Sequence, residues 1–292
     1  MFKDWFGLVF MKIDLHMHSI ASDGKLSPRE LVDLAIEKKI PAIAITDHEV
    51  MDGSREAIKY AKGKNIEVVS GVEIGADDEE FGLFDVHIVG LFLDLDNKEL
   101  LDLSARLMLA RETQKRGMIQ KLGDLGYEIT FEELKKEAGG INYGRPHLAR
   151  ILVRKYDEFE EVDNVFDKLL GYDGIANVRQ EKESIKKTID VIHSAGGVAI
   201  LAHPMLYDDF EKVVDRFIEL GGDGVEVDHS HVGEDSNMYY RVREIARDKD
   251  IVVSGGGDFH SKEDSFEVGD YGISMSEFEK LKKYWERKWK KD

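Results

Sequence analysis

The chain contains no cysteine among its 292 residues, so it forms no disulfide bond and offers no thiolate to a metal ion. Any metal site must therefore use imidazole and carboxylate ligands. Long apolar runs are also missing, which excludes a transmembrane helix. The opening MFKDWFGLVF is too short and too interrupted by charge for a secretory signal. We therefore expect a cytoplasmic location, with residues 1–11 forming an N-terminal extension.

Basic residues are fewer than acidic residues in this chain. The chain has 41 Lys and Arg residues against 59 Asp and Glu residues, which gives a net charge of −18. This balance disfavours a protein that binds long nucleic acid through a basic surface. Bound divalent cations would neutralise part of the excess, and a small anionic substrate held by such ions is compatible with it. We therefore expect neither a membrane nor long duplex nucleic acid as a partner, although short oligonucleotides stay open.

Strand-like and helix-like segments alternate over residues 12–96. Ser27-Pro28 has the residues of a helix start, with serine as the cap and proline in the first turn. Pro41–Thr46 is a continuous apolar run, as expected for a parallel strand buried on both faces. This rhythm is typical of a parallel sheet or barrel with helices packed outside it.

The alternation stops between about Asp96 and Val178, where one helical segment follows another, and it resumes afterwards. A helical insertion into a barrel is the simplest explanation. We predict that residues 12–96 and 179–292 form the barrel and that residues 97–178 form an insertion that recognises the substrate. Seven buried strands can be counted, one fewer than in a standard eight-stranded barrel.

Seven short apolar runs each carry a potential metal ligand at or near one end. In barrel enzymes the catalytic residues lie where the buried strands end. The pattern therefore indicates a hydrolytic metal centre. The runs are Lys12–His18, Ala42–His48, Glu67–Ile74, Val86–Phe92, Val198–Pro204, Val225–His229 and Ile251–His260.

The spacing within these runs supports metal binding, although each residue taken alone has an ordinary explanation. His16 and His18 are two residues apart on a strand, so their side chains share one face. The same spacing recurs in the Gly-Asp-Phe-His ending of the last run. Glu73 lies in an otherwise apolar strand, where a carboxylate usually has a metal or cationic partner. Asp23 is also compatible with a plain turn, since it sits in a Ser-Asp-Gly sequence.

Six histidines and three carboxylates make up the full set of candidate ligands, too many for one ion. Two or three ions fit better, with Glu73 as a bridge, and a set without sulfur suits Zn²⁺, Mn²⁺ or Fe²⁺. Two adjacent ions acidify a bridging water and hold both oxygens of an in-line displacement, as phosphate ester hydrolysis requires. The candidates are His16, His18, Asp23, His48, Glu73, His87, His203, Asp258 and His260.

Six motifs, in the order DLHMHSIASDG, ITDH, GVEI, VHIVGLF, LAHP and GDFH, resemble those of the PHP (polymerase and histidinol phosphatase) family. The resemblance extends from Lys12 to about Gly272. It implies an α/β fold, a distorted (β/α)₇ TIM-like barrel with up to three metal ions at the carboxyl ends of the strands. It also implies three ligand groups: His16, His18, Glu73 and Asp258; Glu73, His87 and His203; and Asp23, His48 and His260.

Within that family, YGRPHLARILV and the segments after it resemble the helical insertion of a subgroup of small phosphoesterases. Members of the subgroup remove phosphate from nucleoside 3′,5′-bisphosphates, and some trim the 5′ ends of short RNA. The resemblance implies that Arg145 and His147 lie near the substrate phosphate, because a guanidinium can bind phosphate oxygens bidentately. Arg179 is a weaker candidate of the same kind. The alternative for Arg145 is an exposed residue at a helix start.

The EVDHSH segment departs from the subgroup pattern, which reads like EVYHPSH. His229 could protonate the leaving alkoxide, because histidine titrates near neutral pH, or it could support a ligand from behind. His231 is a candidate for substrate contact.

The leading hypothesis is a metal-dependent phosphoesterase that hydrolyses a phosphomonoester of a small nucleotide, resembling a nucleoside 3′,5′-bisphosphate, by attack of a metal-bridging hydroxide. A histidinol-phosphate phosphatase and a 5′-3′ exonuclease acting on short RNA are the alternatives within enzymes. A non-catalytic metal-binding scaffold is the least favoured, because no candidate ligand is missing.

Overall fold

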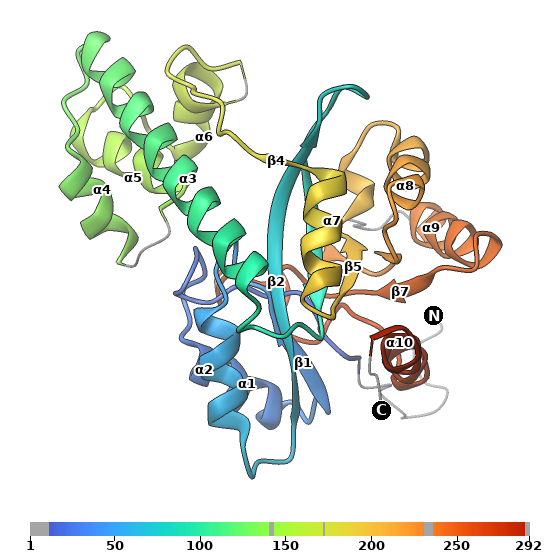
Figure 1. Ribbon diagram of the computed structural model, residues 1–292. Helices are drawn as coiled ribbons and strands as arrows, with labels where there is room; N and C mark the ends of the chain where they lie inside the picture. Colours follow the sequence, from blue (N-terminus) through green and yellow to red (C-terminus); the bar gives the residue numbers. More distant parts are fainter. Residues whose placement is uncertain (1–11, 140–142, 172, 231–235, 290–292) are drawn as a thin grey trace, which may run out of the picture.

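The computed structural model describes residues 12–139, 143–171, 173–230 and 236–289. It has an α/β fold built on a curled, seven-stranded sheet (Figure 1). The strand order is β1-β2-β3-β5-β6-β7, and the short β4 pairs with β2. The strands are β1 Ala42–Ile45, β2 Glu67–Asp78, β3 Leu83–Leu91, β4 Glu183–Ser184, β5 Val198–Leu201, β6 Gly224–Glu226 and β7 Val252–Ser254.

One strand runs against the expected parallel pattern. β3 is antiparallel to both of its neighbours, β2 and β5. The other main pairs, β1–β2, β5–β6 and β6–β7, are parallel. The prediction of parallel strands throughout is wrong here, because only the short turn 79–82 joins β2 to β3, and such a connection reverses the chain. The beginning of β3 therefore lies at the sheet edge where the parallel strands end.

The first expected strand, around the His-Met-His motif, is an extended segment with isolated bridges. Residues 13–17 bridge to Ile43 of β1 and, farther along the chain, to Phe259 and Ile273. The Ala44 N–H donates to the Asp14 carbonyl oxygen at 3.0 Å. On the other side, the Leu15 N–H donates to the Gly255 carbonyl oxygen at 3.0 Å. The segment thus lies between β1 and the stretch that follows β7.

Helices pack against this sheet and enclose an apolar core of strand residues. The first of them starts as the sequence predicts, since the Ser27 and Glu30 side chains form a capping box. No helix in the described part of the chain is long and apolar enough to cross a membrane. The helices are α1 Pro28–Glu37, α2 Asp52–Ala61, α7 Ile185–Ser194, the 3₁₀ helix Pro204–Leu206, α8 Phe210–Glu219, α9 Ser236–Asp248 and α10 Met275–Trp289.

The helical segments of the predicted insertion gather at one end of the long helix α3 (Figure 1). Buried apolar residues between positions 118 and 176 form a hydrophobic cluster of their own. Leu103 of α3 belongs to the main core and Leu122 to this second cluster, so the helix joins the two. The domain boundaries remain a prediction. The segments are α3 Lys98–Asp124, α4 Phe131–Ala138, α5 Arg145–Lys155, α6 Val162–Val165 and the π-helix Phe166–Leu170.

A buried carboxylate, Asp223, ties α7 and α10 to the sheet. It accepts hydrogen bonds from the backbone N–H of Ala199 at 2.9 Å, from His193 Nε2 at 2.7 Å and from the Tyr284 hydroxyl at 2.6 Å. Asp223→Asn removes the charge that these donors share, and we expect it to lower the free energy of unfolding by about 2–3 kcal/mol.

Urea unfolding measures this loss. The matched control is Asp248→Asn, an exposed ion-pair partner of Arg247, which should change the free energy of unfolding by no more than about 0.5 kcal/mol. Equal effects of the two substitutions would show that Asp223 does not hold these helices.

Candidate metal centre and adjoining cleft

The predicted ligands converge on Glu73, a residue of β2 whose side chain is 1% exposed. Its carboxylate oxygens lie 2.9 Å from His48 Nδ1, 2.9 Å from His87 Nδ1 and 3.1 Å from His203 Nε2. The two histidines of the His-Met-His motif approach the same carboxylate through Nε2, at 3.5 and 3.3 Å. The strand ends singled out in the sequence therefore meet, with Glu73 at their centre.

Asp258 supplies a second carboxylate from the loop after β7. Its Oδ1 lies 2.9 Å from His18 Nε2, 3.4 Å from His16 Nε2 and 3.7 Å from His260 Nδ1. The backbone φ of Asp258 is +58°, in the left-handed region, which aspartate enters more readily than most residues. Its N–H donates to the His16 carbonyl oxygen at 2.9 Å, so the loop is held against the first motif.

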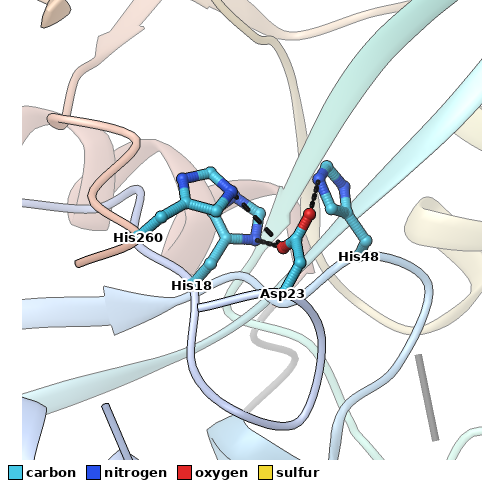
Figure 2. Close-up of side chains that lie close together, drawn as sticks. All are labelled: His18, Asp23, His48 and His260. Carbon is cyan, nitrogen blue, oxygen red and sulfur yellow. Dashed lines mark ion pairs between the residues drawn. The ribbon is translucent and has the colours of Figure 1, made fainter. Parts of the chain in front are cut away.

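Asp23 supplies a third carboxylate from the loop that follows the first motif (Figure 2). Its oxygens lie 3.3 Å from His260 Nε2, 3.7 Å from His48 Nε2 and 3.8 Å from His18 Nδ1. The loop is anchored by the buried Asp47 carboxylate, which accepts hydrogen bonds from two serine hydroxyls of the loop at 2.7 and 2.8 Å. Asp47 thus fixes the loop that carries Asp23.

Candidate ligand atoms that lie within 4.8 Å of one another form overlapping sets. One set has the same members as the first predicted group. In the second, His48 joins Glu73 and His87, while His203 contacts the same Glu73 oxygen as His87. The third contains the predicted residues and His18. The assignment of ligands to individual ions stays a prediction. These three sets are His16, His18, Glu73 and Asp258; His48, Glu73 and His87; and His18, Asp23, His48 and His260. A fourth set joins His16 to two residues outside the predicted ligands, Glu226 and His229.

The tautomers of two histidines show that this donor set suits metal cations. His260 Nδ1 lies 2.8 Å from the Asp258 carbonyl oxygen, which only accepts, so the ring proton is on Nδ1. His16 Nδ1 lies 2.9 Å from a buried oxygen of Glu226 in a similar way. The Nε2 atom of each ring then faces a carboxylate of the cluster, and a bound divalent cation would take the place of a proton there.

Charge at Glu73 leads to the same conclusion. Its Oε2 atom is buried and accepts no hydrogen bond from the described residues. Burial alone would raise the pKa of this carboxyl, but the charges of His87, His48 and His16 outweigh burial and hold the pKa well below its usual range. An ionised, buried carboxylate surrounded by nitrogen donors is what a bridging metal ligand requires.

A cleft of about 380 Å³ opens beside the cluster, between the sheet and the helical insertion. Asp23, His48 and His87 line it on the side of the cluster. Its size falls within the range of pockets that hold small ligands. The rest of its lining includes the cations Arg111, Lys115, Arg145, Arg179 and Lys182.

A sequence model of the PHP domain matches residues 14–228. The chain belongs to the PHP domain family. A 5′-3′ exoribonuclease of Haemophilus influenzae is 35% identical over 253 residues, which cover 85% of this chain and 90% of that protein. A 3′,5′-nucleoside bisphosphate phosphatase of Chromobacterium violaceum is 31% identical, over 85% of this chain and 87% of the relative. These matches confirm the resemblance found in the sequence motifs.

A solved structure agrees with this assignment. A protein from Bifidobacterium adolescentis, described as a metal-dependent phosphoesterase, superposes with a TM-score of 0.79 and 27% sequence identity. The superposition covers 92% of this chain and 94% of the other. The chain therefore shares its fold with that protein over almost its whole length.

Sequence analysis missed Glu226, a fully buried carboxylate of β6 in this PHP domain. One of its oxygens hydrogen-bonds with His16 Nδ1 at 2.9 Å, and the other accepts the backbone N–H of His203 at 2.7 Å. Glu226 therefore orients two candidate ligands at once. The signal that identifies it in the sequence is the one used for Glu73, a carboxylate within an apolar run.

Glu226→Gln is expected to lower metal affinity about 10- to 100-fold, because the uncharged amide has a single accepting oxygen for two donors, His16 Nδ1 and the His203 N–H. Metal content after dialysis against a metal buffer measures the change. Glu219→Gln is the control, since the Glu219 side chain is 68% exposed on the outer helix α8. Equal metal content in both variants and the unsubstituted protein would show that Glu226 orients no ligand.

His229 is fully buried beside the cluster, with its ring centroid 5.7 Å from that of His16 and 5.3 Å from that of His203. Its Nε2 lies 4.0 Å from both Glu226 Oε2 and Asp258 Oδ2. Burial lowers the pKa of His229 to about 3, so the ring is neutral at pH 7. These observations favour support of the neighbouring residues over donation of a proton to the leaving group.

The predicted substrate-binding arginines both line the cleft. Arg145 begins α5, and its guanidinium lies 3.5 Å from the Leu170 carbonyl oxygen. Arg179 is 56% exposed and pairs with Asp77 at 2.8 Å and Glu79 at 3.0 Å. Their contact with substrate stays a prediction.

Of the two remaining candidates for substrate contact, His147 and His231, the structure describes only His147. His147 is buried, and its Nδ1 accepts the N–H of Gly144 at 2.9 Å, capping α5. The neutral ring therefore carries its proton on Nε2. His231 lies outside the described residues, as does the N-terminal extension 1–11.

Proposed function

We propose that this PHP phosphoesterase removes phosphate from a small nucleotide of the nucleoside 3′,5′-bisphosphate type, using two or three divalent ions. The observation that carries the proposal is a ring of nitrogen and oxygen donors around Glu73 that opens onto a cation-lined cleft. The donor set without sulfur favours Mn²⁺, Zn²⁺ or Fe²⁺.

The proposed ligands are the nine cluster residues named above. Divalent ions held by such residues polarise phosphoryl oxygens and lower the pKa of bound water. Around them, Glu226 holds the His16 proton on Nδ1, and Asp258 does the same for His260 through its carbonyl oxygen. Arg145 would meet the substrate phosphate from the opposite side of the cleft. His147, with its proton on Nε2, would donate that proton toward a substrate oxygen.

The size and charge of the binding region support a small substrate. A cleft of about 380 Å³ accommodates a nucleotide rather than a long strand. Basic side chains on the insertion are largely matched by acids, as in Arg154 with Glu137 at 2.8 Å and Lys155 with Glu133 at 2.9 Å. A continuous basic track for long RNA is therefore not what these surfaces favour.

The relatives support the same substrate class. The one from Chromobacterium violaceum is described as a nucleoside bisphosphate phosphatase, and the one from Haemophilus influenzae as a 5′-3′ exoribonuclease. The second description makes short RNA the second candidate substrate. We further propose that the curled sheet and the segment 13–18 act as a distorted (β/α)₇ barrel, and that the cysteine-free chain works in the cytoplasm.

A substrate screen on metal-loaded protein tests the proposal. The substrates are adenosine 3′,5′-bisphosphate, a short 5′-phosphorylated RNA, histidinol phosphate and p-nitrophenyl phosphate, each with Mn²⁺, Zn²⁺ and Fe²⁺. We expect the highest kcat/KM with the bisphosphate. A preference for histidinol phosphate would overturn the nucleotide assignment, and no turnover of any phosphoester would overturn the enzymatic function.

A further inference from the structure

We propose that Glu49 is a positioning residue that couples the metal cluster to the helical insertion. Its backbone holds His48 against Glu73, and its side chain holds α3 and the segment that follows the insertion. The inference rests on the metal-dependent reaction of the proposed function and not on the identity of the substrate. Its consequence is that the order of α3 and the filling of the metal cluster depend on each other.

The backbone of Glu49 connects the loop after β1 to the strand that carries Glu73. Its N–H donates to the Glu73 carbonyl oxygen at 2.8 Å, and the Glu73 N–H donates to the Asp47 carbonyl oxygen at 3.3 Å. These bonds form a bridge between His48 and Glu73, so the pairing of β1 with β2 continues into the loop. His48 Nδ1 thereby comes within 2.9 Å of the Glu73 carboxylate. A shift of Glu49 would move this candidate ligand.

The backbone conformation of Glu49 is unusual for its residue type. Its φ is +63°, in the left-handed region, which residues other than glycine, asparagine, aspartate and histidine seldom enter. Such a conformation persists only where the surrounding contacts hold it, and it is common at functional sites. At Glu49, distant parts of the chain supply those contacts.

The side chain of Glu49 contacts two segments that lie far from it in the sequence. It is 2% exposed, and its two oxygens accept from Arg111 Nε of α3 at 2.7 Å and from Gln180 Nε2 at 3.1 Å. The hydroxyl of Ser104, also on α3, donates to the Glu49 carbonyl oxygen at 2.5 Å. Helix α3 leads into the predicted insertion, and the segment with Gln180 leads out of it. One residue therefore links both ends of the insertion to the loop that carries His48.

These contacts favour a positioning role for Glu49 over direct contact with a ligand. Nitrogen donors already engage both of its carboxylate oxygens. Its negative charge disfavours contact with a phosphate group. Among the described residues, the sets of candidate metal ligands do not include Glu49. Glu49 therefore acts on the reaction through His48 and through the position of α3.

Amide hydrogen exchange tests the coupling without measuring turnover. Exchange in α3 is compared between metal-depleted protein and protein loaded with Mn²⁺. We expect loading to slow this exchange by about threefold or more in the unsubstituted protein, and Glu49→Gln to remove the difference. The matched control is Glu56→Gln, because the 44% exposed Glu56 accepts from Arg29 Nε at the same 2.7 Å but ties α1 to α2. Exchange in α3 that does not respond to metal in the unsubstituted protein, or that responds equally in Glu49→Gln, would overturn the coupling.

Kinetics separate positioning from a purely structural role. At saturating Mn²⁺, Glu49→Gln should lower kcat for p-nitrophenyl phosphate about 10- to 100-fold and keep KM within about threefold. Glu56→Gln should keep kcat within about twofold. A lower melting temperature with an unchanged kcat would show that Glu49 only stabilises the fold. Absence of turnover in the unsubstituted protein would count against the proposed function alone, since the exchange experiment requires none.

A double variant tests whether Glu49 acts together with Arg111. Arg111→Met removes the other charge of the ion pair. If the two residues act as a unit, the double variant Glu49→Gln/Arg111→Met should lower kcat no further than the more damaging single substitution. Losses that multiply would show that the residues act independently, against the inference. The double variant leaves neither charge unpaired, so it replaces Glu49→Gln in the exchange experiment if that variant unfolds.

Discussion

Glu73→Gln is expected to lower kcat/KM for phosphoester hydrolysis by about 10³-fold or more, equal to about 4 kcal/mol of transition-state stabilisation. Glu73 faces imidazoles on several sides at 2.9 to 3.5 Å, so its charge is shared by more candidate ligands than that of any other residue described. A neutral amide cannot bridge two cations. Steady-state kinetics and metal analysis on the same preparation measure the loss.

The control for this substitution lies on the same strand. Glu67 begins β2, is 44% exposed and pairs with Lys282 on the outside of the fold. Glu67→Gln should therefore leave both metal content and kcat/KM close to those of the unsubstituted protein. Full activity of Glu73→Gln with a full complement of metal would remove Glu73 from the centre.

Asp258→Asn is expected to lower kcat about 10²- to 10³-fold and to reduce the number of bound ions. Its Oδ1 lies 2.9 Å from His18 Nε2, and asparagine retains only one oxygen and no charge there. Asparagine also tolerates the left-handed backbone at this position, where φ is +58°, so the loop should keep its course. Metal stoichiometry and single-turnover rates measure the two effects separately.

Asp250→Asn is a close control for the backbone. Asp250 is exposed, has a φ of +52° and lies in the turn before β7, away from the cluster. Its substitution should change neither rate nor metal content. A similar loss in both variants would mean that the left-handed geometry, rather than the Asp258 carboxylate, is responsible.

The local sequence determines much of this fold. The capping residues Ser27 and Glu30 start α1 where the sequence places it, and the apolar run Ala42–Ile45 forms a buried strand. Such features depend on neighbours within a few positions, so they are readable from one sequence. The direction of β3 is different, because it follows from the short connection to β2 and not from the composition of either strand.

The convergence of the candidate ligands could be predicted for a physical reason. A histidine or carboxylate at the end of an apolar run has few stable environments, so its recurrence in seven runs indicates a common site. Glu226 was not predicted, because the Asp228-His229 pair at the end of the same run carries the same signal. In the structure Glu226 contacts His16 directly at 2.9 Å, whereas His229 Nε2 lies 4.0 Å from the nearest Glu226 oxygen.

Lys115, a buried residue of α3, shows what a single sequence conceals. Lysines are common on helix surfaces, and nothing in the sequence of α3 distinguishes this one from exposed lysines on the same helix. Its burial depends on distant chain segments, including residues 177–180 and Arg145, which line the same cleft. Long-range packing of this kind is not encoded in local periodicity.

One measurement tests the metal-dependent reaction most directly. Metal-depleted protein is titrated with Mn²⁺, and bound metal and phosphate release from adenosine 3′,5′-bisphosphate are followed in the same samples. We expect release to rise with bound metal and to reach its maximum at two or three ions per chain. Full metal occupancy without phosphate release from this or any other phosphoester would contradict a hydrolytic metal centre around Glu73.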